Sequence, residues 1–162
     1  MKIDFALLLK NKSLKIQRTE WMPAFEIYDD VVISKPFELT ACAYIEQDKI
    51  YVELAAVYIT TMTCSRCLIE FTTKQTLRFK EGYTPDQLEE HYPQGVLDTA
   101  ELAREQIILK TPIKNVCKDD CLGLCPVCGK DKNIHACDCE TEKKNPYFEK
   151  LEVLLSDTDK EV

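Results

Sequence analysis

The chain has 162 residues, of which 45% are hydrophobic, and carries a formal net charge of -7 and nine cysteines. This length allows one sizeable hydrophobic core but not two large ones. The negative charge argues against a protein that coats nucleic acid by bulk electrostatics, since nonspecific binding depends on phosphate neutralisation by Lys and Arg. Any RNA contact would therefore need a local basic patch.

No apolar segment has the length of a membrane span or of a secretory signal. The run at residues 5–9 is short and follows Asp4, whereas a membrane span needs roughly 20 apolar residues. We therefore expect a cytoplasmic protein without membrane association. In that reducing compartment disulfides are rare, so paired cysteines are expected to bind metal or to perform redox chemistry.

The first predicted elements in chain order are β-strands. Residues 37–46 alternate apolar and polar side chains, as a half-buried strand does. A turn is predicted at residues 47–49, residues 50–63 are rich in Val, Ile, Tyr and Thr, and residues 69–79 alternate again. The predicted fold class is α+β, with an antiparallel β-meander or a partly closed barrel as its core and a few helices.

Two helices are predicted after the strands from their capping residues. A short helix at residues 85–91 would be capped by Thr84, with a proline in its first turn. A longer one at about residues 98–110 would begin with a capping box at Asp98 and end before Pro112.

The chain is expected to divide into four segments. Residues 1–112 form the β-rich core with its helix, and residues 113–142 form a cysteine-rich zinc-binding segment. Residues 145–156 form a C-terminal helix whose apolar stripe packs on the core, and residues 157–162 form an acidic tail. The cysteine-rich segment has too few apolar residues to fold by burial, so something other than a hydrophobic core must order it.

The cysteine spacing predicts that zinc orders this segment. Cys125-Pro-Val-Cys128-Gly129 has the form of a zinc knuckle, in which a tight turn aims two thiolates at one ion and the glycine relieves the backbone. Cys137 and Cys139 can supply the other two ligands. A structural zinc site contributes on the order of 10 kcal/mol of folding energy. The competing interpretation, stray reduced cysteines in a loop, does not account for the spacing.

A second set of ligands is available outside this knuckle. One pair lies at the predicted turn between two strands and another just after the second helix; these are Cys64, Cys67, Cys117 and Cys121. Four pairs can form two four-ligand sites in three ways, and spacing does not choose between them. We favour one site of Cys125, Cys128, Cys137 and Cys139, with the second set as the other. The prediction is one or two Zn²⁺ ions, the second of which would clip the C-terminal segment onto the meander.

Three other residues have the chemistry of ligands. Cys42 lies in an alternating strand and is expected to be a small buried side chain. His135 lies within the metal segment and could replace a sulfur, but with eight cysteines present we expect it to be a loop residue. His91 is assigned no role.

Two basic clusters offer local patches for RNA. The first contains Lys2, Lys10, Lys12, Lys15 and Arg18, and the second contains Arg66, Lys74, Arg78 and Lys80. Such clusters are more often solvated surface than binding sites.

The order of these motifs resembles the YceD family of bacterial and plastid proteins. The residues that carry the resemblance are Cys64-Ser-Arg-Cys67-Leu68, Leu97-Asp98 at the start of the longer helix, the cysteine run 117–139 and Asn145-Pro-Tyr-Phe. The resemblance covers residues 36–155. It implies a noncatalytic factor required for accumulation or maturation of large-subunit (23S) ribosomal RNA in ribosome biogenesis, which binds metal and is a candidate for RNA binding.

Two other functions are open to a protein with these motifs. The first is a zinc-dependent thiol redox protein or redox-switched chaperone using Cys64 and Cys67 or the C-terminal cysteine cluster. Reactive pairs normally sit at helix N-termini, however, whereas Cys64 and Cys67 fall between two strands. The second is a hydrolase, which four thiolates around zinc disfavour because they leave no position for water. The expected partners are ribosomal RNA or ribosomal proteins of the large subunit, with no enzymatic activity and no small-molecule substrate.

Overall fold

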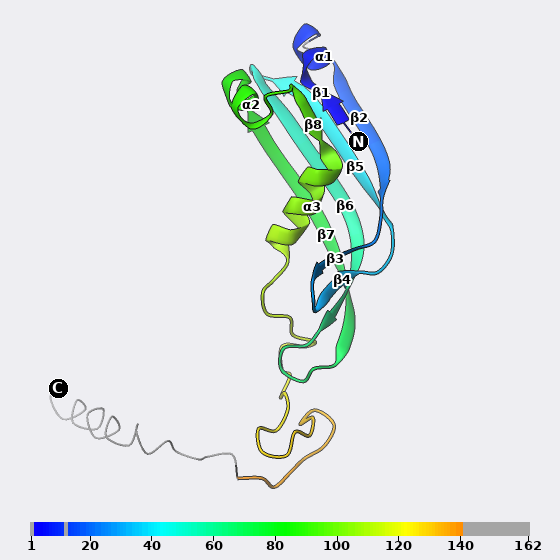
Figure 1. The fold of residues 1–162 in the computed structure, drawn as a ribbon, viewed down its shortest axis with the longest axis vertical. Helices are drawn as coiled ribbons and strands as arrows, with labels where there is room; N and C mark the ends of the chain where they lie inside the picture. The colour runs from blue at the N-terminus through cyan, green and yellow to red at the C-terminus, as the bar shows by residue number, and fades with distance from the viewer. Residues whose placement is uncertain (1, 12, 141–162) are drawn as a thin grey trace, which may run out of the picture. The chain divides into compact units, whose positions relative to one another are not determined.

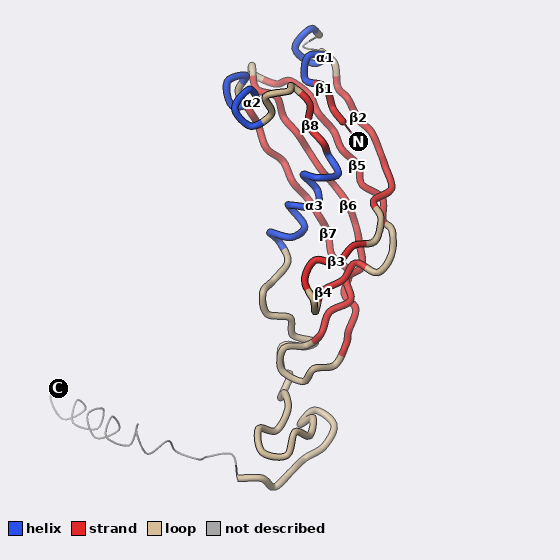
Figure 2. Tube along the Cα trace, in the orientation of Figure 1, coloured by secondary structure: helices blue, strands red, loops and turns tan. Residues whose placement is uncertain are grey.

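The computed structural model describes residues 2–11 and 13–140. The chain divides into two compact units. The first unit contains Met1–Cys64 and Ile69–Cys117, and the second contains Ser65–Leu68 and Lys118–Val162. All described helices and strands belong to the first unit, and the described part of the second consists of loops and turns (Figure 2).

Six strands form an open antiparallel sheet in the first unit (Figure 1). They are β2 (Lys15–Met22), β3 (Phe25–Tyr28), β4 (Val31–Ile33), β5 (Phe37–Glu46), β6 (Lys49–Thr63) and β7 (Glu70–Tyr83). β5, β6 and β7 are the predicted meander, and β2 and β4 add to it by pairing with β5 and β6. Of the two predicted forms the meander is correct. The sheet is not a closed barrel, because in the described part of the chain β2 pairs with β5 alone and β7 with β6 alone.

The predicted boundaries of β5 and β6 are accurate because turn chemistry determines them, whereas β7 continues to Tyr83, beyond its predicted end at residue 79. The β5–β6 turn contains Gln47 and Asp48, both of which have positive φ angles of 49° and 60°, the conformation required by a tight hairpin turn. β6 pairs with β5 over residues 49–56 and with β7 over residues 50–63. β4 pairs with β6 further along, at Thr61 and Met62. The α+β fold class is thus confirmed.

The N-terminal elements carry no clear periodicity, and none was predicted for residues 1–36. The short strand β1 (Lys2–Asp4) pairs with β8 (Val96–Asp98), which precedes the longer helix. Helix α1 (Phe5–Lys10) begins at Asp4, whose side chain accepts a hydrogen bond from the Ala6 backbone N–H. These elements are too short to be recognised without their distant partners.

Both predicted helices are present with their caps. Helix α2 (Pro85–His91) has a reciprocal capping box between Thr84 and Gln87. Helix α3 (Thr99–Lys110) begins at Asp98, whose carboxylate accepts hydrogen bonds from two backbone N–H groups of the first turn. The predicted C-terminal helix at residues 145–156 and the acidic tail lie outside the described residues.

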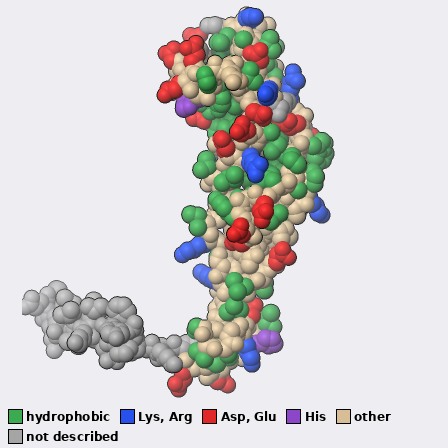
Figure 3. All heavy atoms as spheres, viewed as in Figure 1, with side chains coloured by type: hydrophobic (Ala, Val, Ile, Leu, Met, Phe, Trp, Pro, Cys, Tyr) green, Lys and Arg blue, Asp and Glu red, His purple; other side chains and the backbone are tan. Residues whose placement is uncertain are grey.

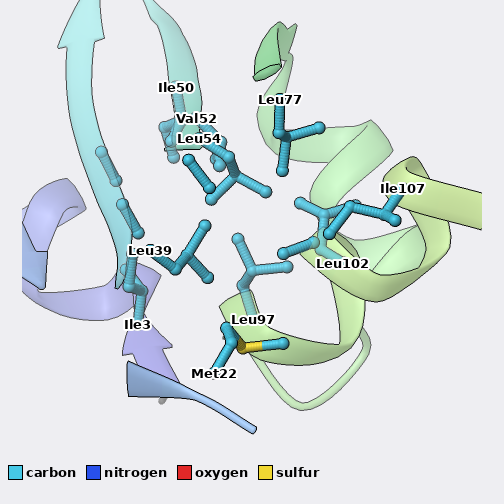
Figure 4. Close-up of a cluster of buried hydrophobic side chains, with 14 of the residues drawn as sticks. Ile3, Met22, Leu39, Ile50, Val52, Leu54, Leu77, Leu97, Leu102 and Ile107 are labelled. Atoms are coloured by element: carbon cyan, nitrogen blue, oxygen red, sulfur yellow. The ribbon is translucent and has the colours of Figure 1, made fainter. Parts of the chain in front are cut away.

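Helix α3 and the inner face of the sheet enclose the core (Figure 4). On β6 the even-numbered residues from Ile50 to Tyr58 are buried, and the odd-numbered ones face away from the core. Leu39, Leu54, Leu77, Leu97, Leu102 and Ile107 meet in this layer. The opposite, outer face of the sheet is therefore free to carry polar and aromatic side chains.

Candidate metal centres

The eight predicted ligand cysteines come together in two groups of four. In each group the Sγ atoms lie within 4.8 Å of one another. Four thiolates bound to zinc at about 2.3 Å would be about 3.8 Å apart, so each group needs only a small contraction to surround an ion. The first tetrad is Cys64, Cys67, Cys117 and Cys121, and the second tetrad is Cys125, Cys128, Cys137 and Cys139. Of the three possible combinations of pairs, the structure contains the favoured one.

Backbone and amide groups surround the sulfurs of the first tetrad. The Cys64 backbone N–H donates to the Ile69 carbonyl at 2.9 Å, which closes the β6–β7 connection. The Cys117 backbone N–H donates to Cys64 Sγ at 3.4 Å, and Asn133 Nδ2 donates to Cys121 Sγ at 3.4 Å. Donors of this kind stabilise the thiolate form, which is the form that binds metal.

The second tetrad has the geometry of a zinc knuckle at its first pair. The backbone N–H groups of Cys128 and Val127 donate to Cys125 Sγ, and these bonds lower the pKa of the Cys125 thiol to about 6. Gly129 has a φ of +72°, and its N–H donates to the Cys125 carbonyl at 2.9 Å. The glycine therefore has the role that the sequence predicted for it.

Two other thiols of the second tetrad, those of Cys137 and Cys139, have raised pKa values and stay in their neutral form. Hydrogen bonding to the Cys128 side chain, together with desolvation, raises the pKa of Cys139 to about 12. A hydrogen bond to the Cys125 side chain raises the pKa of Cys137. The first thiolate of the tetrad forms easily, but a second thiolate within 4.8 Å of the first would be repelled by it. A bound dication removes that repulsion, which is the chemistry a four-thiolate metal site supplies.

Hydrogen bonds within the second unit join its short loops. Leu124 forms an isolated bridge with Asp131, and its N–H donates to the Arg66 carbonyl at 3.0 Å. Arg66 Nη1 in turn donates to the Cys121 carbonyl at 3.0 Å. Four large apolar side chains of this unit, Leu68, Leu122, Val127 and Ile134, are more than 60% exposed. The described part of the unit thus has no hydrophobic core of its own.

Gly123 and Gly129 offer a matched pair of substitutions in this unit. Gly123 has a φ of +70°, and an added Cβ would lie 3.0 Å from the Arg66 carbonyl oxygen. At Gly129, with a φ of +72°, the space beside the backbone is open. We expect Gly129→Ala to cost about 1 kcal/mol of backbone strain. Gly123→Ala should cost more, because it adds a backbone clash.

Competition of the purified protein with a zinc chelator would measure the difference between the two glycine variants. The Gly123→Ala protein should lose metal at a lower chelator concentration than the Gly129→Ala protein. Equal retention of metal by the two proteins would show that the contact with Arg66 does not support the metal centres.

The other candidate ligands lie outside both tetrads. Cys42 is 7% exposed on β5, and burial raises the pKa of its thiol, so its predicted place as a small buried side chain is confirmed. The backbone N–H of His135 donates to the Asp131 carbonyl, and His135 belongs to neither sulfur group. The His91 ring packs at 6.3 Å from that of Tyr83.

The two basic clusters that are contiguous in the sequence do not form two contiguous patches in the structure. Lys15 and Arg18 lie on opposite sides of β2, because side chains alternate along a strand, and Lys12 lies outside the described residues. The first cluster is therefore not one patch. In the second cluster, Arg66 donates to the carbonyls of Asp119 and Cys121 within the second unit.

The outer face of the sheet collects the other basic residues. Lys74, Arg78 and Lys80 pair across from odd-numbered residues of β6 and share this face, and Lys15 Nζ joins them 5.6 Å from the Tyr44 ring. Tyr44 stacks on Tyr51 with ring centroids 5.6 Å apart. Lys80 Nζ lies 2.9 Å from the Tyr44 hydroxyl and 3.0 Å from a Glu53 carboxylate oxygen. We name Lys15, Lys74, Arg78, Lys80, Tyr44 and Tyr51 the outer-face cluster. Strand alternation was the signal that could have grouped them.

No described helix is both long and apolar enough to cross a membrane. Cys64 and Cys67 lie in the connection between β6 and β7, and no described helix begins there.

These features define an α+β protein with an open antiparallel sheet and two groups of four cysteines placed to hold metal ions. Residues 52–155, more than half of the chain, match the model of the family described as large ribosomal RNA subunit accumulation protein YceD, and the chain belongs to this family. The match spans all eight clustered cysteines and confirms the resemblance seen in the sequence. No curated protein and no solved structure matches the chain.

Proposed function

We propose that this protein is a noncatalytic factor for the accumulation or maturation of 23S ribosomal RNA, and that it works in the cytoplasm. The observation that carries the proposal is the family match over residues 52–155, because the family's description refers to the accumulation of large ribosomal RNA. The proposed partners are ribosomal RNA and ribosomal proteins of the large subunit.

The two tetrads are proposed to hold one Zn²⁺ ion each. Their donor set supports zinc, because four cysteine sulfurs are typical of structural zinc. A site closed by four thiolates has no open coordination position for a substrate. The metal would therefore stabilise the fold, and this supports a binding protein over a hydrolase.

The RNA contact is proposed to lie on the outer-face cluster. Stacked tyrosines offer a platform for unpaired bases, and the neighbouring ammonium and guanidinium groups can neutralise phosphates. The cations lie within one sheet face, although the whole chain is acidic. Such a local patch is what RNA binding by an acidic protein requires.

Crosslinking in the native cells, followed by sequencing of the attached RNA, tests this function. The expected result is enrichment of one region of large-subunit RNA or its precursor. Lys74→Ala combined with Arg78→Ala should reduce that enrichment severalfold. Lys35→Ala combined with Lys114→Ala removes two exposed lysines elsewhere and should leave it unchanged. If only background RNA were recovered, the protein would act on the ribosome through a protein partner rather than by binding RNA directly.

A further inference from the structure

Three adjoining hollows cross the helix side of the first unit. The largest, of about 700 Å³, lies between the end of β2 and α3. It shares Asp98, Glu101 and Glu105 with a second hollow of about 260 Å³. The second shares Tyr92 and Gln94 with a third of about 330 Å³ beside α1 and α2. Neighbouring hollows share lining residues, and we name the three hollows together the helix-side groove.

Trp21 lines the largest hollow and is 73% exposed. It is the only tryptophan of the chain. Tryptophan carries a large apolar area, and an exposed one beside a hollow is typical of an anchor at a binding surface. It also lies on β2, an edge strand whose ladder bonds run only to β5 within the described residues. An edge strand of this kind can accept an extended chain.

The charge of the groove is strongly negative at α3. The largest hollow is lined by four carboxylates, those of Glu20, Asp98, Glu101 and Glu105, and by one cation, Arg104. The Arg104 guanidinium lies 5.1 Å from the centroid of the Phe25 ring. Figure 3 shows acidic side chains gathered over α2 and around α3 on this face.

Glu101 and Glu105 are exposed and one helical turn apart. Like charges at this spacing repel one another. A cation bound between them would relieve that repulsion, so the helix presents a site that is more stable when a positive group occupies it.

We propose that the helix-side groove binds an extended basic segment of a partner protein. Lys or Arg side chains of the segment contact Glu101 and Glu105, and a cationic side chain lies over Trp21. An apolar side chain enters the third hollow, where Phe5, Leu9 and Leu88 line the wall. The carboxylates repel the phosphates of RNA. The proposal goes beyond the ribosomal role, since the groove shares no residue with the tetrads or the outer-face cluster.

Titration of the full, zinc-loaded chain with a short Lys/Arg-rich peptide that contains apolar residues tests the proposal. Because Trp21 is the only tryptophan, its emission reports on the groove directly. We expect a blue shift of this emission on binding and protection from acrylamide quenching. A peptide with Glu in place of the basic residues should not bind. Failure of the basic peptide to bind, or binding without any change in Trp21 emission, would overturn the proposal.

Charge-neutralising variants locate the contact. Glu101→Gln combined with Glu105→Gln should weaken peptide binding about fivefold or more. Glu46→Gln combined with Glu70→Gln removes the same charge from exposed positions outside the groove and should change affinity less than about twofold. If both double variants weakened peptide binding equally, the effect would come from net charge alone, and binding in the groove would be contradicted. Displacement of the peptide by single-stranded RNA from the same site would also contradict it. None of these readouts depends on recovery of ribosomal RNA from cells.

Discussion

Replacing Cys128 by Ser should release one of two zinc ions and unfold residues 122–140, while the first unit stays folded. Cys128 is the exposed member of the second tetrad, so its sulfur contributes little packing that the substitution would also remove. The described residues of the second unit have no hydrophobic core, and a structural zinc site is worth on the order of 10 kcal/mol. Without that contribution the conformational entropy of the loops dominates.

Metal analysis and hydrogen exchange together measure this outcome. The variant should contain one zinc per chain, and the amides of residues 122–134 should lose their protection while those of β5 and β6 keep theirs. Cys42→Ser is the matched control, because Cys42 belongs to neither tetrad and its loss should leave both ions in place. Two zincs in the Cys128→Ser protein, or unchanged protection of the loops, would show that the segment folds without the second ion.

Short-range signals were sufficient to predict the meander and its helices. β5 alternates over ten residues, which is long enough for the period to be read, and β6 is recognisable from its content of Val, Ile, Tyr and Thr. The caps Thr84 and Asp98 are local hydrogen-bonding signals. The elements at residues 1–36 were missed for a different reason. β1 has three residues and exists through its pairing with β8, a contact between segments more than ninety positions apart.

The cysteine ligands were also predictable from short-range signals, whereas the two proposed binding surfaces were not. Two cysteines in one tight turn reach the same ion, so their spacing in the sequence already describes the site. The helix-side groove joins Trp21 of β2 to Glu101 of α3, and the outer-face cluster joins Lys15 of β2 to Lys80 of β7 through two tyrosines. Such surfaces form only when the sheet brings distant strands together. The second basic cluster therefore predicted the outer-face cluster only in part, through Lys74, Arg78 and Lys80, and neither basic cluster predicted the groove.

Ile107→Ala should lower the free energy of unfolding of the first unit by about 3 kcal/mol. Ile107 is fully buried in the core layer, where α3 packs on the sheet. Removal of its side chain leaves a cavity that the surrounding side chains fill only in part. Leu109→Ala is the matched control on the same helix, because Leu109 is 76% exposed. It should change the free energy of unfolding by less than about 0.5 kcal/mol.

Denaturant unfolding of the zinc-loaded proteins, followed by far-ultraviolet circular dichroism, distinguishes the two variants. Both substitutions introduce alanine, the best helix former, so a large loss in the Ile107 variant alone must come from packing rather than from helix propensity. Equal losses of unfolding free energy in the two variants would mean that α3 is held mainly by its cap and its ends. The carboxylates of the helix-side groove, which lie on the other side of this helix, would then lack the rigid support that a preorganised binding surface requires.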